Sequence, residues 1–215
     1  MAFSLRDILK FNLATRGDLN RVYTGTWAGR PTTGLIAGTT AQFTDLNNIL
    51  LYTDGTNWLP INGRATIARV GAQVAAAAQY TTETPLLTLP IKGGLARIHG
   101  GIELDFQLSY TNSSNSKTVR LRIGTSLPTG TTGLLWNHTL TTTTDSIVRG
   151  AGFQNRGSLS SQIQTAVPFS NGGGNGAAPL TTTQDTSADY NLYLTAQTTS
   201  PDTVALESYT AYLCG

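Results

Sequence analysis

Glu103 and Asp105 are a pair of carboxylates that could carry out acid–base chemistry, because residues two apart on a strand project from the same face. Two carboxylates at a suitable separation can hydrolyse a glycosidic bond. The residues around them alternate between apolar and polar, which places the apolar ones inward and both carboxylates on the solvated face. The chain has only three glutamates and no second acidic cluster. Catalysis by this pair, such as polysaccharide degradation, is therefore the least favoured hypothesis for function.

The other reactive side chains form no catalytic or metal-binding pattern. The two histidines, His99 and His138, lie far apart in sequence, and the single cysteine, Cys214, can neither form an intramolecular disulfide nor hold a metal by itself. The glycine-rich stretch 172–176 is not followed by the Lys-Ser/Thr pair and helix of a phosphate-binding loop. We therefore expect a protein that is not an enzyme and that uses no cofactor and no metal.

The composition indicates a β-protein with little charge. Only 12% of the residues are charged and 39% are hydrophobic, while Thr occurs 36 times and Gly 23 times in 215 residues. Thr favours strands because it is β-branched, and Gly permits tight turns. The net charge of +2 gives no strong field for nucleic acid, and Arg120 and Arg122 are expected on a solvated sheet face. The apolar run 74–78 is too short to span a bilayer, so we expect no membrane insertion.

Residues 81–215 have the spacing of short strands separated by turns. The clearest strands cover 86–89, 102–108, 118–123, 190–194 and 204–209, and weaker ones cover 134–136, 146–148 and 159–163. In two of the clearest strands apolar and polar residues alternate strictly, which is the period of a sheet with one solvated face. This pattern predicts an all-β fold: an antiparallel β-sandwich of the jelly-roll type, preceded by a short helix and a small β-hairpin anchor region.

The first 15 residues form a separate apolar segment. Ser4 followed by Asp7 fits a weak capping box and predicts a helix of about two turns. So short a helix is marginal by itself, so it needs a surface to pack against. That surface is either the sandwich of the same chain or a larger assembly. The apolar residues of the segment are Phe3, Leu5, Ile8, Leu9, Phe11 and Leu13.

Residues 16–63 are rich in turn formers and contain a hairpin signal. Asp54-Gly55 lies between apolar or aromatic flanks, and both central residues of such a turn need a positive φ. Trp27 and Trp58 are expected to pack across this element. Together with Tyr23 and Tyr52 their spacing suits a small aromatic core, and stacking of these four rings on sugars is the alternative. So few strands need a neighbour for stability. We divide the chain into an N-terminal anchor and hairpin region (1–63), a connector (64–80) and a β-sandwich domain (81–215).

Two stretches resemble bacteriophage virion proteins. The first runs from Thr26 through Gln42 to the segment Tyr52-Thr-Asp-Gly-Thr-Asn-Trp58, and it resembles a short module that recurs in phage fibre and tail proteins. It departs from the usual pattern at Ala41, where a glycine normally precedes the glutamine. The second, residues 101–124 with 155–162, is similar to strand–turn–strand segments of phage head-fibre and tail-fibre jelly rolls.

The resemblance implies a non-enzymatic structural protein of the virion, a head or tail appendage such as a fibre or a decoration protein. Such proteins are often homotrimers packed around a three-fold axis. The resemblance therefore implies two kinds of partner, further copies of the same chain and other phage head or tail proteins. It also implies a chain that is made in the host bacterial cytoplasm and resides in the virion. No catalytic residue is carried over.

Two hypotheses for function follow. In the first, the N-terminal region docks on the particle and the sandwich projects outward. The residues expected to anchor the particle are Leu5, Ile8, Leu9, Phe11, Trp27 and Trp58. In the second, the protein binds a host receptor and grips a surface glycan with the loops near 112–117 and 170–180, because loops on a rigid sandwich are a common place for binding.

Overall fold

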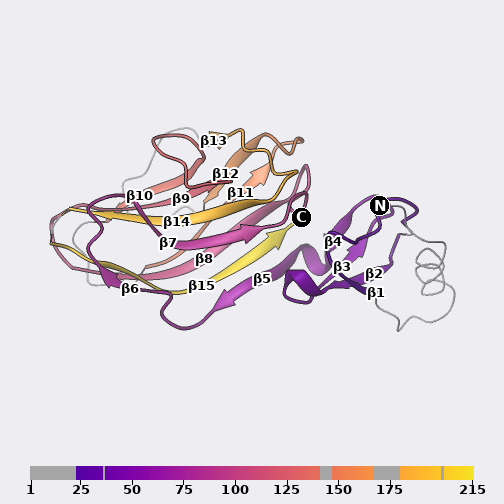
Figure 1. The fold of residues 1–215 in the computed structure, drawn as a ribbon, viewed down its shortest axis with the longest axis horizontal. Coiled ribbons are helices and arrows are strands. Elements are labelled where there is room, and N and C mark those ends of the chain that lie inside the picture. Colours follow the sequence, from indigo (N-terminus) through magenta and orange to yellow (C-terminus); the bar gives the residue numbers. More distant parts are fainter. Residues whose placement is uncertain (1–22, 36, 141–146, 167–179, 200) are drawn as a thin grey trace. The chain divides into compact units, whose positions relative to one another are not determined.

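The chain folds into two compact units, Met1–Ile67 with Cys214–Gly215 (unit 1) and Ala68–Leu213 (unit 2). The structure, a computed structural model, describes residues 23–35, 37–140, 147–166, 180–199 and 201–215 (Figure 1). The predicted N-terminal helix lies outside these residues. Within the described part, no helix is long and apolar enough to cross a membrane.

Unit 1 is a small sheet with the strand order β1-β2-β3-β4. The first pair of strands is parallel and the other two pairs are antiparallel. Its elements are β1 (Tyr23–Gly25), β2 (Thr40–Phe43), the 3-10 helix η1 (Thr44–Leu46), β3 (Ile49–Thr53), β4 (Trp58–Pro60) and the 3-10 helix η2 (Ile61–Gly63).

The hairpin predicted at Asp54-Gly55 joins β3 to β4, but its turn differs from the expected one. The Asp54 amide donates to the Asn57 carbonyl over 3.1 Å, so four residues rather than two close the loop. One carboxylate oxygen of Asp54 accepts the amides of Thr56 and Asn57 at 2.8 and 2.7 Å. Only Gly55 has a positive φ, of 98°. The Asp54 side chain holds the loop, which a two-residue pattern does not anticipate.

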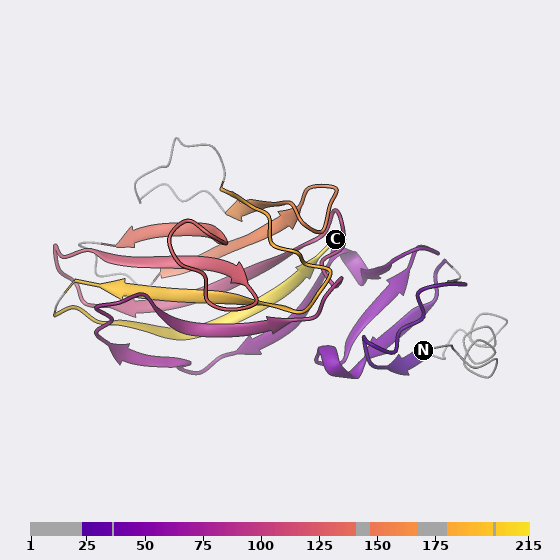
Figure 2. The same cartoon turned by 45° about the horizontal axis from the view of Figure 1, so that its top comes forward.

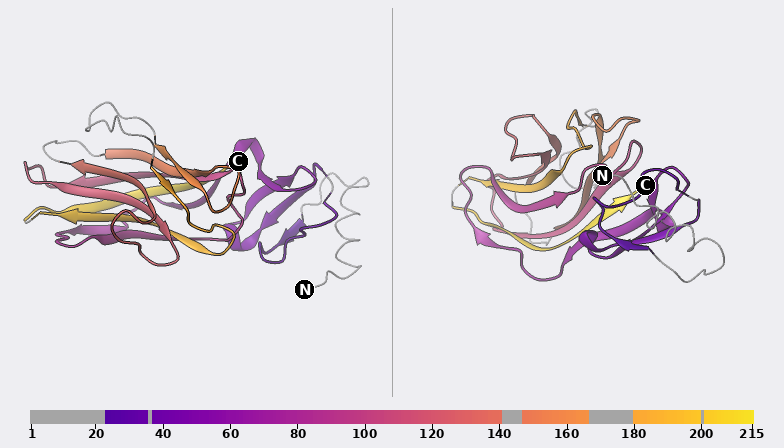
Figure 3. Two further views of the ribbon diagram at one scale, coloured as in Figure 1. Left: turned by 90° about the horizontal axis from the view of Figure 1, so that it is seen from above. Right: turned by 45° about the vertical axis from the view of Figure 1, so that its right-hand side comes forward.

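Unit 2 contains two sheets that face each other (Figure 2 and Figure 3). One has the order β10-β9-β14-β7, and the other has the order β13-β12-β11-β8-β15-β5, with β6 also paired to β15. The strands are β5 (Arg64–Val70), β6 (Ala75–Ala78), β7 (Thr84–Ile91), β8 (Gly101–Tyr110), β9 (Lys117–Gly124), β10 (Leu134–Leu140), β11 (Ile147–Asn155), β12 (Gln162–Ala166), β13 (Thr181–Thr182), β14 (Tyr190–Thr198) and β15 (Val204–Cys214).

This strand order is that of a jelly roll. From β6 to β9 consecutive strands alternate between the sheets, and β9 and β10 form a hairpin within one sheet. The last two strands, β14 and β15, each insert between strands formed much earlier in the chain. The order β6-β15-β8-β11 over β7-β14-β9-β10 therefore confirms the predicted jelly-roll sandwich.

Residues 64–80, predicted as a connector, carry the strands β5 and β6. Both belong to the border of the sheet that contains β15. The Val74 amide donates to the Leu206 carbonyl over 2.8 Å, just ahead of β6. The alanine run gave no period-two signal because every residue in it is small and apolar, and pairing with a long partner strand decides its structure.

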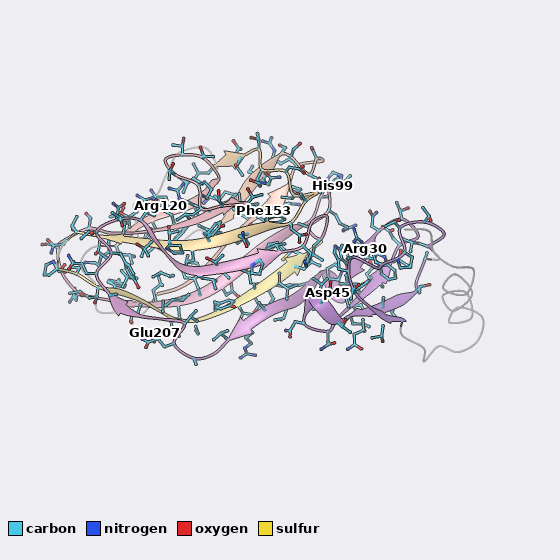
Figure 4. The ribbon with its side chains drawn as sticks, in the orientation of Figure 1. Arg30, Asp45, His99, Arg120, Phe153 and Glu207 are labelled. Atoms are coloured by element: carbon cyan, nitrogen blue, oxygen red, sulfur yellow. The ribbon has the colours of Figure 1, made fainter. Side chains whose placement is uncertain are left out.

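The core of unit 2 follows the alternation seen in the sequence. In β8 the four inward side chains are at most 1% exposed: Ile102, Leu104, Phe106 and Leu108. Phe153 on β11 meets Tyr190 on β14 edge to face, with 6.2 Å between ring centroids, and so links the two sheets (Figure 4). Gly152 lets β8 approach β11 closely, since a Cβ there would lie 2.1 Å from the Ile102 carbonyl oxygen.

Candidate functional site

One end of unit 2 gathers three loops that belong to distant parts of the sequence. They connect β6 to β7, β8 to β9 and β14 to β15. The Thr198 amide donates to the Tyr80 carbonyl over 2.6 Å, and the Thr111 amide donates to the Thr203 carbonyl over 3.0 Å. These bonds tie the three loops into one surface, which we call the loop end.

A buried ion pair lies under the loop end. The side chain of Lys117 is 0% exposed and that of Asp202 is 2% exposed, with 2.8 Å between the ammonium nitrogen and a carboxylate oxygen. The same ammonium donates to the carbonyl of Asn115 at 2.8 Å, and it lies 3.1 Å from the Ser113 hydroxyl. The lysine therefore has its donors satisfied without water, which is what makes its burial tolerable.

Asp202 is an ionised carboxylate at neutral pH. The hydrogen bond from Lys117, followed by the one from the Ser113 hydroxyl, holds the pKa of Asp202 below its usual value. The loop that carries Asp202 is thereby fixed to the loop that carries Ser113. We call this buried ion pair, which joins the two loops, the Lys117–Asp202 pin. Its burial keeps both charges from any ligand that approaches the loop end.

Among its described residues, the loop end presents mainly uncharged polar groups to solvent; Glu83, 21% exposed and paired with Arg120 and Arg122, is the charged exception. The exposed side chains of the three loops are hydroxyls, amides and one proline: Gln79, Thr81, Thr82, Asn112, Ser114, Ser116, Thr199 and Pro201. Hydroxyls and amides both donate and accept hydrogen bonds. Such a surface matches neutral polar ligands.

A second polar network lies where the sequence predicted a solvated arginine face. Glu83 accepts two hydrogen bonds from Arg122 and one from Arg120, the latter over 3.1 Å. Arg122 also donates to the carbonyls of Gly130 and Thr132, at 2.9 and 3.1 Å, and is only 1% exposed. The expectation of a solvated face is therefore wrong for Arg122, because the β9–β10 loop covers it.

The charge of Glu83 is stabilised by this network. Burial raises the pKa of Glu83, but the hydrogen bonds from Arg122 and Thr195 and the charges of both arginines outweigh it, so the pKa is lowered. Both arginines are thus engaged within unit 2 by a carboxylate from the β6–β7 loop. The ion pairs with Glu83 therefore account for the presence of two arginines on this strand.

In unit 1, Trp27 and Trp58 form an aromatic core around Phe43. The ring centroids lie 5.3 Å (Trp27) and 5.5 Å (Trp58) from that of Phe43, both edge to face, and each tryptophan is 4% exposed. The Trp58 indole nitrogen donates to the Pro31 carbonyl over 3.1 Å. The aromatic-core interpretation is confirmed for Trp27 and Trp58, and stacking of these two rings on a sugar is not possible while they are buried. It is wrong for Tyr52, which lies on the opposite face of β3 and is only partly buried.

Arg30 and Asp45 hold the loop that covers this core (Figure 4). The Arg30 guanidinium carbon lies 3.8 Å from the Trp27 ring centroid, and the same side chain donates to the Trp27 carbonyl over 2.7 Å. A carboxylate oxygen of Asp45 accepts the Trp27 amide at 2.7 Å. Trp27 is thus held by its ring, its amide and its carbonyl.

The anchoring residues predicted from the sequence fall into two groups. Leu5, Ile8, Leu9 and Phe11 lie outside the described residues. Trp27 and Trp58 are core side chains of unit 1, so contact with a partner would have to use other residues of this unit. Of the predicted glycan-binding loops, residues 170–179 are also outside the described part. In the other loop Lys117 is buried and Ser113 is part of the pin.

The sequence contains a signal for the buried lysine. In β9 the inward positions are Val119, Leu121 and Ile123, and Lys117 lies in the same phase. A charged residue at an inward position requires a buried partner. No local pattern identifies that partner, because Asp202 lies 85 residues further along the chain.

Glu103 and Asp105 lie on β8 between fully inward residues and are partly exposed, as the alternation predicted. His138 stacks on Trp136 with 5.7 Å between ring centroids. Among the residues that the structure describes, no group of His, Cys, Asp or Glu side chains could hold a metal ion.

Comparison with known proteins gives a fold likeness only. No protein-family model matches the chain, and no curated protein matches it. Two similar solved structures are virus proteins: an infectious bursal disease virus Gx strain structure (9% identity, TM-score 0.33) and the VP2 subviral particle of the same virus (11% identity, TM-score 0.34). A lectin from Bauhinia forficata in complex with GalNAc is also similar (11% identity, TM-score 0.30).

The lengths of these proteins differ from that of the chain. The matches cover 77% and 86% of the chain but only 34% and 41% of the two virus proteins. The lectin match covers 88% of the chain and 96% of the lectin. At these TM-scores the likenesses carry no argument about function, and the strand order described above is what defines the fold.

Proposed function

We propose that the chain is a non-enzymatic structural subunit of a bacteriophage particle, a head or tail appendage that docks through its N-terminal region and projects the β-sandwich. The observation that carries the proposal is the form taken by the phage-like motif Tyr52–Trp58. It is the β3–β4 hairpin of a separate small unit, and its Trp58 fills the core of that unit. This supports a modular protein in which one unit attaches and the other projects.

The use of charge in unit 2 also supports a structural role. Lys117, Asp202, Glu83 and Arg122 are engaged with each other or with backbone carbonyls. Charged groups that act on a substrate have to face a space that the substrate can enter. Here they join loops and strands that are distant in sequence, which stiffens a projecting body.

Incorporation into particles tests this proposal. The full chain and a variant lacking residues 1–63 would be supplied in trans and quantified by immunoblot on gradient-purified particles. We expect the deletion to reduce incorporation at least tenfold. An Asn112→Ala/Ser114→Ala variant, altered only at the loop end, is the matched control and should incorporate fully. Full incorporation of the truncated chain contradicts docking through the N-terminal region.

The oligomeric state is a further part of the proposal. A homotrimer would suit an appendage, because cyclic packing of sandwiches adds interface area around one axis. Light scattering coupled to size exclusion would then give three times the monomer mass of 22.8 kDa. A monomer at every concentration would contradict the trimer in solution and would leave the docking test unaffected.

A second candidate function is recognition of a host surface glycan by the loop end. The observation that favours it is the neutral surface of hydroxyls and amides held rigidly over the Lys117–Asp202 pin. Rigid neutral donors and acceptors suit sugar hydroxyls, because little side-chain or loop ordering remains to oppose binding. Adsorption of phage to host cells in the presence of purified protein tests it. We expect the wild-type protein to inhibit adsorption and the Asn112→Ala/Ser114→Ala variant to inhibit less. No inhibition by the wild-type protein contradicts it.

A further inference from the structure

Exposed and partly buried residues alternate along the β8–β9 loop, which belongs to the loop end. The exposed residues are Asn112, Ser114 and Ser116, and the partly buried ones between them are Thr111, Ser113 and Asn115. Lys117, the next residue in this alternation, is fully buried. The first set is thus available to a ligand, whereas the second can hold the loop in place.

Both ends of the β8–β9 loop are bound to the β14–β15 loop. The Thr203 amide donates to the Thr111 hydroxyl over 2.9 Å. At the other end, the amide and the hydroxyl of Thr199 both donate to the Ser116 carbonyl, each over 3.1 Å. These bonds fix where the loop begins and ends, but they do not set the backbone between residues 112 and 115.

The Ser113 hydroxyl holds the middle of the loop. It donates a hydrogen bond to the Asp202 carboxylate, accepts the Asn115 amide over 3.1 Å, and lies 3.1 Å from the Lys117 ammonium nitrogen, which donates to it. A hydroxyl has one hydrogen to donate and two lone pairs that accept. All three are used here, so this one group joins the loop backbone to both members of the Lys117–Asp202 pin.

The position of Ser113 in the chain gives this hydroxyl a role in binding. Asn112 and Ser114 are its immediate neighbours, so the backbone that the hydroxyl fixes also decides where their exposed side chains lie. A loop that is ordered before a ligand arrives loses less conformational entropy on binding than a loop that the ligand has to order. A serine that makes no contact with the ligand can therefore set its affinity.

We infer that Ser113 is the positioning residue of the loop end, and that its hydroxyl holds Asn112 and Ser114 in the conformation that binds a neutral glycan. The two neighbours contact the sugar hydroxyls, and Ser113 acts on the ligand only through them. The Lys117–Asp202 pin is the support to which this hydroxyl is attached. The inference rests on glycan recognition by the loop end, the second candidate function above.

Adsorption of phage to host cells in the presence of the purified full-length protein tests the inference. Ser113→Ala removes the hydroxyl but keeps both exposed neighbours and the ion pair, so we expect its half-inhibitory concentration to rise at least tenfold over that of the wild type. Ser113→Thr, which keeps a hydroxyl, should restore most of the inhibition. The matched control is Thr186→Ala, which removes a buried hydroxyl that donates to the Leu159 carbonyl over 2.7 Å. Thr186 precedes β14, at the opposite end of this strand from the loop end, so its loss should leave inhibition unchanged.

Hydrogen exchange in the free protein tests the same role without a ligand. We expect the Asn115 amide, which donates to the Ser113 hydroxyl, to exchange at least tenfold faster in Ser113→Ala than in the wild type or in Thr186→Ala. Unchanged exchange overturns the inference. If the wild type inhibits adsorption and Ser113→Ala inhibits equally, the positioning role is wrong while glycan recognition stands. If the wild type gives no inhibition, both fail. Equal losses of inhibition in Ser113→Ala and Thr186→Ala would assign the effect to general destabilisation and would also contradict the inference.

Discussion

Unit 1 and unit 2 fill their cores with different proportions of aromatic and aliphatic side chains. In unit 1, three aromatic rings form much of the core, two from the short strands β2 and β4 and that of Trp27 from the loop after β1, and a cation and a carboxylate fix this loop. In unit 2, mostly aliphatic residues from long strands, with rings such as Phe153 and Tyr190 among them, fill the space between two sheets, and an ion pair lies at one end. The smaller unit depends on a few large contacts, whereas the larger one distributes its burial over many residues.

This difference follows from size. A small domain buries a smaller fraction of its surface on folding, so each large side chain carries a greater share of the stability. A jelly roll has enough strands to bury a continuous core and can accommodate a charged pair without losing its fold. We therefore expect substitutions to affect the two units independently, with the largest effects where a single side chain has no substitute.

The largest effect is expected from Phe43→Ala in unit 1. Removing a buried phenylalanine costs about 3–5 kcal/mol, and a sheet of four short strands has little stability to lose. Trp27 and Trp58 report on unit 1 and Trp136 reports on unit 2. In a Trp136→Phe background, tryptophan fluorescence therefore follows unit 1 alone. In Phe43→Ala we expect the thermal transition of unit 1 to disappear, or its midpoint temperature to fall far below that of unit 2. Circular dichroism follows the transition of unit 2. Loss of both transitions together would show that the two units do not unfold independently.

The next largest effect is expected from Lys117→Met in unit 2. This change leaves the Asp202 carboxylate buried without its cation, which is more damaging than removing both charges. We expect the single variant to lower the melting temperature of unit 2 by several degrees and the double variant Lys117→Met/Asp202→Leu to recover much of the loss. Differential scanning calorimetry measures both. If the double variant melts lower than the single one, the unpaired Asp202 carboxylate is not the cause of the loss.

A smaller effect is expected from acid. The pKa values of Asp202 and Glu83 are lowered in the folded protein, so both carboxylates contribute stability above their unfolded pKa values. That contribution is lost as the pH falls through the lowered folded pKa values. We expect the melting temperature of unit 2 to fall between pH 5 and pH 3 more steeply in the wild type than in Lys117→Met/Asp202→Leu. If the melting temperature falls equally steeply with pH in both proteins, Asp202 is not the cause of the loss of stability in acid.

The smallest effect is expected from Arg30→Ala in unit 1. The guanidinium over Trp27 contributes about 0.5–1 kcal/mol at an accessible site. Tryptophan fluorescence in the Trp136→Phe background should show a small decrease in the melting temperature of unit 1, and Arg30→Lys should restore part of it. The transition of unit 2 should not change. A loss as large as that of Phe43→Ala would show that Arg30 holds the covering loop by more than the ring contact.

Much of the fold was predictable because the alternation of β8 and β9 sets which side chains face inward. Ile102, Leu104 and Phe106 lie where the period placed them. The alanine run of β6 was not predictable as a strand, since a run of identical small residues has no phase. At the β3–β4 loop, the Asp54-Gly55 dipeptide correctly predicted a hairpin but not the conformation of its turn. The hydrogen bonds of the Asp54 side chain determine that conformation.

The candidate site was less predictable than the fold. The glycan-binding hypothesis included Lys117, whose charge is buried under the loop end and engaged by Asp202. The arginine face was expected to be solvated, but the β9–β10 loop covers Arg122. In both cases the deciding partner comes from a loop, and loop positions depend on how the strands pair across the whole unit.

The sequence by itself determined the class of the protein: an all-β chain with little charge, a jelly-roll strand pattern and a small aromatic hairpin unit ahead of it. These properties are local, because propensity and period act over a few residues. Only the tertiary structure decided which charges are buried together, since Lys117 and Asp202 meet through the insertion of β14 and β15 between earlier strands. It also decided that Trp27 and Trp58 are core residues, because burial depends on which surfaces the folded chain brings into contact.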